Sequence, residues 1–140
     1  MKTPFNGADL PFEQGIDLDY FHNLVHDLYD SSLTPFTEEE VLEVFDFYFS
    51  DYRVFRGRDH PRLGRENILK IIRKMHKDDF GNTYTVEDYV DGQSFKPRMI
   101  DKYFKTEFPN CDYNINHFFY GRIRSYRYQE CLRDKEKEHG

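Results

Sequence analysis

The sequence predicts an all-α fold, a compact helical domain of about five to six helices that contains two diverged helix-pair repeats. Two observations predict this fold. Apolar residues recur three and four positions apart through most of the chain. Threonines that can cap a helix, each followed three positions later by an acid, precede two of these stretches. The 140 residues fit one domain, and an aromatic share of 18% lets few apolar positions bury a sizeable core.

The chain is expected to form a single helical domain over 1–140 with three parts. Residues 1–16 carry Pro and Gly and are predicted to be an irregular arm, 17–78 form an acidic-then-basic first part, and 79–140 hold the second repeat and the C-terminal helix.

A first helix is predicted to begin at Asp17 or Asp19, because either carboxylate can accept the unpaired backbone N–H groups of a helix start. A second helix begins after Thr37, which forms a capping box with Glu40. Its apolar face is broad, which predicts packing on more than one side. The apolar residues are Tyr20, Phe21, Leu24, Val25 and Leu28 in the first helix and Val41, Leu42, Val44, Phe45, Tyr48, Phe49 and Tyr52 in the second.

Further helices are predicted from the same signals. A loop over 56–62, with Gly57 and Pro61, precedes a third helix over 64–76, whose cations lie outward and towards its C-terminus. The last helix is expected over about 122–136, with its arginines exposed.

The middle of the second half follows the same logic. Thr85 and Asp88 form a second capping signal. Helical spacing then continues through Phe108, and Pro109 is expected to end that helix. Asp112 is expected to cap the short helix that follows.

The two capped segments align as an internal repeat. With Thr37 set against Thr85, residues 45–49 match 100–104, and the second copy is seven residues longer. The excess equals the segment 92–98, which carries Gly and Pro and is predicted to be an inserted loop. A unit that cannot bury its own apolar face must stack on a neighbour, so two copies would share one core. The alternative is chance similarity between amphipathic helices.

Inserted loops often contact partners. Four side chains of the segment suit such contacts and are predicted partner-binding residues: Gln93, Phe95, Lys96 and Arg98. The alternative is that the inserted segment is a surface loop without a function.

Charge is segregated along the chain. The net charge is −6, yet Pro4 to Tyr52 contains no Lys or Arg and 12 acidic residues, whereas Arg53 to Lys77 holds nine basic residues and two acidic ones. Two interpretations stay open. The segments can lie against each other and partly cancel, or one of them can stay open and steer a charged partner.

The acidic interpretation predicts a host protein with a basic surface as the partner, possibly a nuclease. Acids of the first two helices are the predicted binding residues: Asp27, Asp30, Glu38, Glu39, Glu40, Glu43 and Asp46.

The alternative partner is nucleic acid. Basic residues of the loop, the third helix and the last helix would contact phosphates, with tyrosines of the last helix stacking on bases. The residues are Arg53, Arg56, Arg58, Arg62, Arg65, Lys70, Arg73, Lys74, Arg122, Arg124 and Arg127. The overall isoelectric point near 5.5 counts against it.

The sequence gives little support for a catalytic site or a metal site. His22 and His26 share a helix face, but the third ligand that a metal site needs is not evident. Cys111 and Cys131 are too few for a disulfide framework, and His117 is six residues from Cys111. We therefore expect no enzyme, no metal and no cofactor. With no apolar stretch for a leader or a membrane helix, we expect a cytoplasmic protein without a membrane partner.

The stretches His60-Pro-Arg-Leu63 and Cys111-Asp-Tyr-Asn-Ile-Asn-His-Phe118 resemble small accessory proteins carried by phages and mobile elements of Gram-positive bacteria. The resemblance covers about the last two-thirds of the chain. It implies a compact, acidic, helical protein that binds a host factor, in the manner of anti-CRISPR inhibitors that occupy a nuclease's nucleic-acid channel. It also implies a non-enzymatic role in the cytoplasm of a bacterial host cell.

Overall fold

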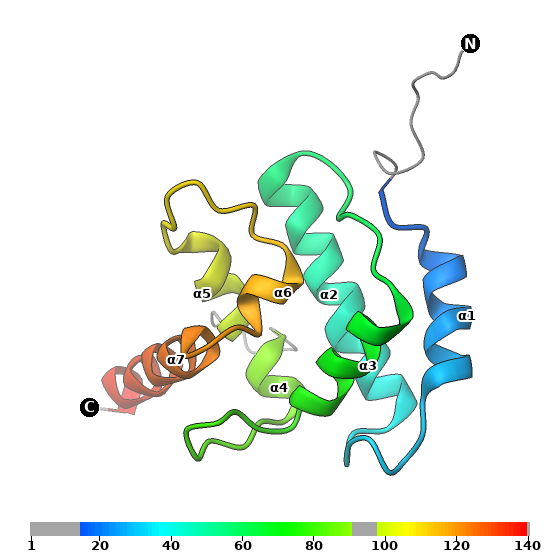
Figure 1. Ribbon diagram of the computed structural model, residues 1–140. Helices are drawn as coiled ribbons and strands as arrows, with labels where there is room; N and C mark the ends of the chain where they lie inside the picture. The colour runs from blue at the N-terminus through cyan, green and yellow to red at the C-terminus, as the bar shows by residue number, and fades with distance from the viewer. Residues whose placement is uncertain (1–14, 91–97, 140) are drawn as a thin grey trace.

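The computed structural model describes residues 15–90 and 98–139, with side chains described as far as residue 137. This part of the chain is all-α, as predicted, and holds seven helices, more than the five to six expected (Figure 1). Two isolated β-bridges, Gly15 with Pro61 and Lys77 with Thr83, accompany them. The helices are α1 (Leu18–Leu28), α2 (Glu38–Arg56), α3 (Arg65–Lys74), α4 (Val86–Tyr89), α5 (Met99–Lys105), α6 (Ile115–Phe118) and α7 (Ile123–His139).

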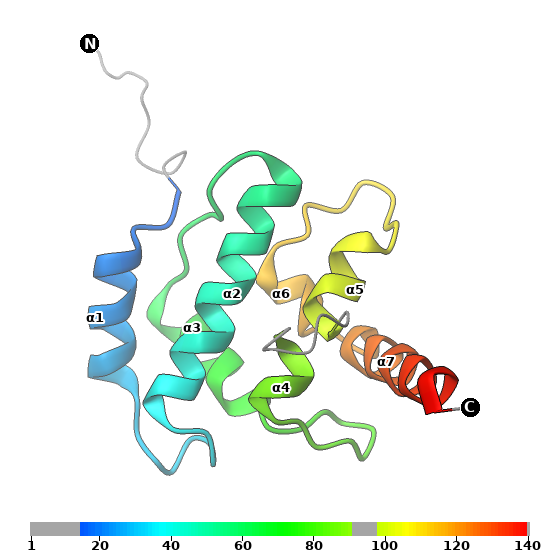
Figure 2. The same cartoon turned by 180° about the vertical axis from the view of Figure 1, so that it is seen from behind.

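Helix α2 lies at the centre of the fold. It packs against α1, α4 and α5, while α1 also contacts α3. Figures 1 and 2 show α1 at one side of the molecule and α7 projecting at the opposite side. Helix α7 packs on α5 and α6. The broad apolar face of α2 is therefore buried on several sides, as predicted.

The predicted helix starts in the first half are confirmed. Asp17 Oδ1 accepts the backbone N–H of Tyr20 at 3.2 Å. Thr37 accepts the N–H of Glu40 at 3.1 Å, and Glu40 Oε1 accepts the N–H of Thr37 at 2.8 Å. Helix α2 ends at Gly57, whose φ of 73° is left-handed and suits a residue without Cβ.

The two aligned segments fold differently. The first is one continuous helix of 19 residues, whereas the second is divided between α4, with four residues, and α5, with seven. The caps do correspond, since Asp88 Oδ2 accepts the N–H of Thr85 at 2.8 Å. Tyr48 and Tyr103, which the alignment equates, lie in contact in the core, with ring centroids 6.1 Å apart.

The prediction that the helix before Pro109 runs through Phe108 is wrong, because α5 ends at Lys105. The Thr106 hydroxyl donates to the carbonyl of Lys102 at 2.7 Å, and the backbone then becomes extended. Tyr113 holds the next turn, because its hydroxyl donates to Thr106 O at 2.7 Å and accepts from Phe108 N at 2.9 Å. Thr106 and the side chain of Tyr113, which comes from later in the sequence, thus fix the end of α5.

The prediction that Asp112 caps α6 is wrong. The cap is Asn114, whose side chain accepts the N–H of Asn116 at 2.9 Å. The Asp112 carboxylate instead accepts the Tyr52 hydroxyl at 3.1 Å and pairs with Arg58. It therefore ties the α5–α6 loop to the end of α2.

The core is rich in tyrosines whose hydroxyls are satisfied. Tyr48 donates to the carbonyl of Tyr113 and Tyr89 to that of Met75, both at 2.6 Å. Tyr48, Tyr52, Tyr89 and Tyr103 are all fully buried. Each buried ring removes a large apolar area from water while its hydroxyl joins distant segments, so a chain with modest apolar content builds a specific core.

Candidate functional site

An open groove with an acidic rim runs along the outer face of α2, beside α1. The carboxylates of Glu39, Glu43 and Asp46 form its rim, and the half-buried side chains of Leu42 and Phe47 lie beside them. The three acids are four and three positions apart, so they lie on one face of the helix. His22 of α1 closes the other side. We call this feature the acidic groove.

The histidines of α1 contact α2 carboxylates. His22 Nε2 lies 2.7 Å from Asp46 Oδ1, and His26 Nδ1 lies 3.0 Å from Glu38 Oε2. The hydrogen bond that His26 donates to the Glu38 carboxylate raises the pKa of His26. Among the described residues, no group of three or more His, Cys, Asp and Glu side chains is placed to hold a metal ion.

Of the seven predicted acidic residues, the structure brings Glu39, Glu43 and Asp46 together. Glu40 belongs to the capping box and Glu38 contacts His26. The other two, Asp27 and Asp30, are exposed at the end of α1 and do not line the acidic groove. Asp30 accepts the N–H of Ser32 at 2.9 Å, and this bond lowers the pKa of its carboxyl.

Arg124 is a buried residue, which corrects two predictions: that the arginines of the last helix are exposed and that this one contacts phosphate. Only 3% of it is exposed. Its Nη1 donates to Lys74 O at 2.7 Å and to the Tyr89 hydroxyl at 2.9 Å, and its Nη2 donates to Lys77 O at 3.3 Å. The carbonyls at the end of α3 have no helical partner, and Arg124 supplies the donors.

Three other predicted phosphate contacts have carboxylate partners. Arg53 pairs with Asp59 and Arg58 with Asp112, while Arg127 Nε lies 2.5 Å from Glu130 Oε1. All three partners lie outside the acidic span 4–52. Two cations of the basic segment are thus paired, Arg53 with Asp59 of the same segment and Arg58 with Asp112 of the α5–α6 loop.

The remaining predicted basic residues are mostly exposed. Lys70 and Lys74 of α3 share a hollow with Asn67, Asn116 and the exposed ring of Tyr120. The guanidinium carbon of Arg122 lies 4.1 Å from the centre of the Phe80 ring. The others, Arg56, Arg62, Arg65 and Arg73, lie on the surface.

The predicted contact loop is only partly described. Gln93, Phe95 and Lys96 lie outside the described residues. Arg98 is half-buried and occupies the N-cap position of α5. The prediction that these side chains bind a partner stays a prediction.

Sequence reasoning missed one cluster of reactive side chains, at the α5–α6 loop. Cys111 Sγ lies 3.3 Å from His117 Nδ1, and the Tyr103 hydroxyl lies 2.8 Å from the same nitrogen. The separation of six positions between Cys111 and His117 argued against such a pair. The loop bends enough because Asn110 and Tyr113 both have left-handed φ angles, 60° and 62°. Asn110, which tolerates that conformation, was the one available signal.

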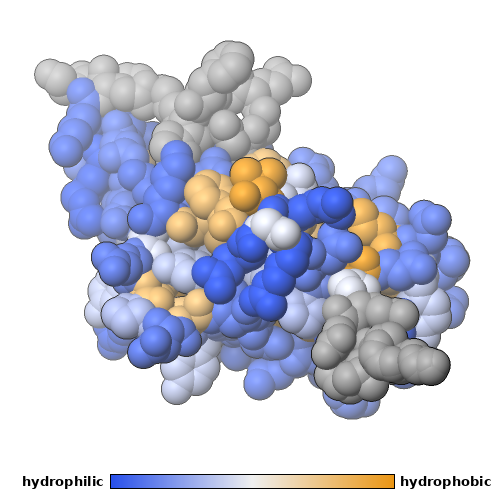
Figure 3. All heavy atoms as spheres, turned by 90° about the horizontal axis from the view of Figure 1, so that it is seen from above, coloured by the Kyte–Doolittle hydropathy of each residue, from blue (hydrophilic) through white to orange (hydrophobic). Residues whose placement is uncertain are grey.

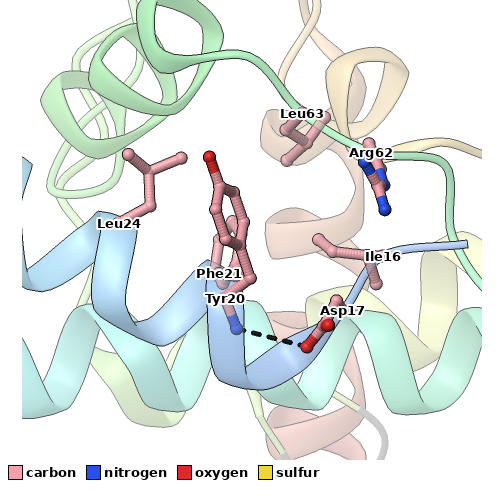
Figure 4. Close-up of a pocket in the computed structure, with 7 residues that line it drawn as sticks. All are labelled: Ile16, Asp17, Tyr20, Phe21, Leu24, Arg62 and Leu63. Carbon is pink, nitrogen blue, oxygen red and sulfur yellow. Dashed lines mark hydrogen bonds between the residues drawn. The ribbon is translucent and has the colours of Figure 1, made fainter.

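A further hollow lies between the start of α1 and the segment before α3 (Figure 4). Apolar side chains such as Ile16, Phe21 and Leu63 line it. Two charged residues, Asp17 and Arg62, complete the lining. It holds about 40 Å³, far below the roughly 300 Å³ of a typical small-molecule site. Its lining residues come from α1, from the residues just before it and from the segment before α3, and its volume is too small for a drug-sized ligand.

The view in Figure 3 shows a surface that is mainly hydrophilic, with separate small hydrophobic patches. No helix in the described residues is both long enough and apolar enough to span a bilayer. No family model, curated protein or solved structure matches the chain. Any proposal about function therefore depends on the residues of this chain.

Proposed function

We propose that this is a non-enzymatic, phage-type accessory protein that binds a host protein through the acidic groove and inhibits or modulates it. The partner would present a basic surface, plausibly the nucleic-acid site of a nuclease in the cytoplasm of a bacterial host, as in the anti-CRISPR class. One observation carries the proposal: Glu39, Glu43 and Asp46 lie in a row on one face of α2, flanked by the half-buried Leu42 and Phe47.

The chemistry of the acidic groove favours a protein over other ligands. Lys and Arg side chains of a partner would meet the rim, and their aliphatic parts or a neighbouring apolar side chain would cover Leu42 and Phe47. Covering Phe47 removes water from the rim and so strengthens the charge contacts. Nucleic acid would be repelled by the same three carboxylates. A nuclease channel, which accepts a row of phosphates, suits a row of carboxylates on one helix face.

The test reverses the rim charges. Glu39→Lys, Glu43→Lys and Asp46→Lys together are expected to weaken binding by about 100-fold or more, because each replaces an attraction with a repulsion. A pull-down from a bacterial host lysate identifies the partner, and calorimetry with the purified partner gives the affinity at two salt concentrations. Affinity of the unaltered protein should fall steeply with salt.

The control reverses three exposed acids outside the acidic groove. Glu87→Lys, Glu107→Lys and Glu136→Lys change the net charge equally and leave the rim intact. This control variant is expected to keep most of the affinity. If the rim variant binds as tightly as the unaltered protein, or no more weakly than the control, the acidic groove is not the binding site.

The hollow shared by Lys70, Lys74 and Tyr120 favours a second candidate function, that of a DNA-binding accessory or regulatory protein. Two cations beside an exposed aromatic ring suit phosphate contact and base stacking. A gel shift at low salt is then expected with micromolar protein and lost in Lys70→Glu with Lys74→Glu. Absence of a shift with the unaltered protein removes this candidate.

A further inference from the structure

In the loop between α5 and α6, two polar groups contact the sulfur of Cys111. Besides the His117 contact, the backbone N–H of Tyr113 donates to Cys111 Sγ at 3.2 Å. Both contacts depend on the left-handed residues Asn110 and Tyr113, which lie on either side of Cys111. Residues other than glycine adopt that conformation at a cost, and such strain is concentrated at functional sites. Cys111 is half-buried and keeps part of its surface exposed, so a small reagent can approach it.

His117 is in the protonation state that a base requires. Burial lowers its pKa, so the imidazole is neutral at pH 7 and can accept a proton. In the tautomer that carries its proton on Nε2, the Nδ1 atom can accept a hydrogen bond from the Cys111 thiol or from the Tyr103 hydroxyl. Burial raises the pKa of Tyr103 far above its usual range, so this phenol stays neutral. His117 is therefore the group that takes a proton from Cys111.

The charges around the loop favour an anionic reagent. The guanidinium of Arg56 lies over the ring of Tyr113, at 5.4 Å from its centre, and that of Arg127, which pairs with Glu130, lies over the ring of Phe108, at 5.8 Å. The carboxylate of Asp112, the residue after Cys111 in the chain, already pairs with Arg58 and accepts the Tyr52 hydroxyl. Cations near a thiol promote its reaction as a thiolate.

We propose that Cys111 is a reactive thiol that forms a mixed disulfide with a small, carboxylate-bearing disulfide, with His117 as its base. The Cys111 sulfur attacks one sulfur of the reagent as His117 Nδ1 takes the thiol proton, and a new S–S bond forms. The S–S bond of the reagent breaks, and its second sulfur leaves with the electron pair. That thiolate then takes the proton from His117. One thiol and one disulfide thus give one mixed disulfide and one thiol.

The chain contains its own reference thiol. Cys131 on α7 is 7% exposed, and burial raises its pKa to about 11. It is expected to react far more slowly than Cys111 for both reasons.

The test treats the full chain with oxidised glutathione at pH 7 and locates the adduct by peptide mass spectrometry. We expect the adduct on Cys111, an unchanged rate in Cys131→Ser, and a rate about tenfold or more lower in His117→Asn. The rates of the unaltered protein and His117→Asn should converge at about pH 10, where thiols deprotonate without a base. Rates for the two proteins within twofold at pH 7, or equal modification of both cysteines, would overturn the proposal.

A second variant separates base chemistry from packing. Tyr103→Phe keeps the buried ring and removes the hydroxyl that competes for His117 Nδ1, so the Cys111 rate is expected to stay at or above that of the unaltered protein. If Tyr103→Phe slows the reaction as much as His117→Asn does, packing explains the rate and the proposal fails. The readout holds even where His117→Asn loosens the fold, because unfolding exposes Cys131 and adds its adduct.

Discussion

Arg124→Met is expected to lower the free energy of unfolding by about 3 kcal/mol, since bonds from charged donors contribute about 1.5–3 kcal/mol each. The methionine fills a similar volume but donates no hydrogen bond. The carbonyls of Lys74 and Lys77 and the hydroxyl of Tyr89 would then lose their donor in a buried place. The guanidinium also lies 4.7 Å from the centre of the Phe119 ring, a contact that the substitution removes as well.

Arg122→Met is the matched control. Arg122 lies on the exposed side of the same helix start, over Phe80, and its loss is expected to cost less than about 1 kcal/mol. Urea denaturation of both variants measures the difference. Equal losses in the two variants would show that the buried bonds of Arg124 contribute little.

Lowering the pH from about 6.5 to about 4 is expected to remove about 3 kcal/mol of stability through His60 alone. Burial lowers the pKa of His60 to about 4. Its Nδ1 donates to Pro61 O at 2.7 Å and its Nε2 accepts the N–H of Ile115 at 3.0 Å, so both nitrogens are satisfied only in the neutral ring. Aromatic rings of α2, such as Tyr52 and Phe49, enclose it.

The sign follows from proton binding. Between pH 6.5 and 4 an unfolded chain protonates this histidine and the folded chain does not, so acid favours unfolding. The contribution is complete above pH 6.5 and is lost as the pH falls towards 4. Denaturation of the unaltered protein and of His60→Gln across this range measures the effect, because the other titrating groups are common to both. The stability difference between them should shrink with falling pH.

His26→Gln provides a control of opposite sign. Glu38 raises the pKa of His26, so the contribution of this residue is present at low pH and is lost as the pH rises through that pKa. A difference between the unaltered protein and His60→Gln that stays constant from pH 7 to pH 4 would contradict the assignment of His60.

The first half of the fold was predictable because its signals are local. Asp17, the Thr37–Glu40 box and Gly57 act within a few residues of the helix ends that they set. In the second half the decisive contacts are distant. Thr106 ends α5 with help from Tyr113, and Arg124 bonds to a carbonyl 50 positions earlier. From the apolar periodicity of the sequence alone, every arginine of α7 is predicted to be exposed, whereas Arg124 is buried.

The candidate sites divide in the same way. Glu39, Glu43 and Asp46 share a helix face, so their grouping follows from spacing. The pairing of Cys111 with His117 requires two left-handed residues in an irregular loop, and spacing gives no measure of such bends.

The buried tyrosine hydroxyls have an optical consequence. Burial raises the pKa of Tyr89 to about 12 and raises the pKa values of Tyr48 and Tyr103 well above their usual range. These phenols become phenolates only when the core opens, whereas the rings of Tyr120 and Tyr126 stand in water. The chain has 11 tyrosines and no tryptophan. The phenolate absorbance of the buried tyrosines in alkali therefore reports the opening of the core, and unfolding can be followed without an attached dye.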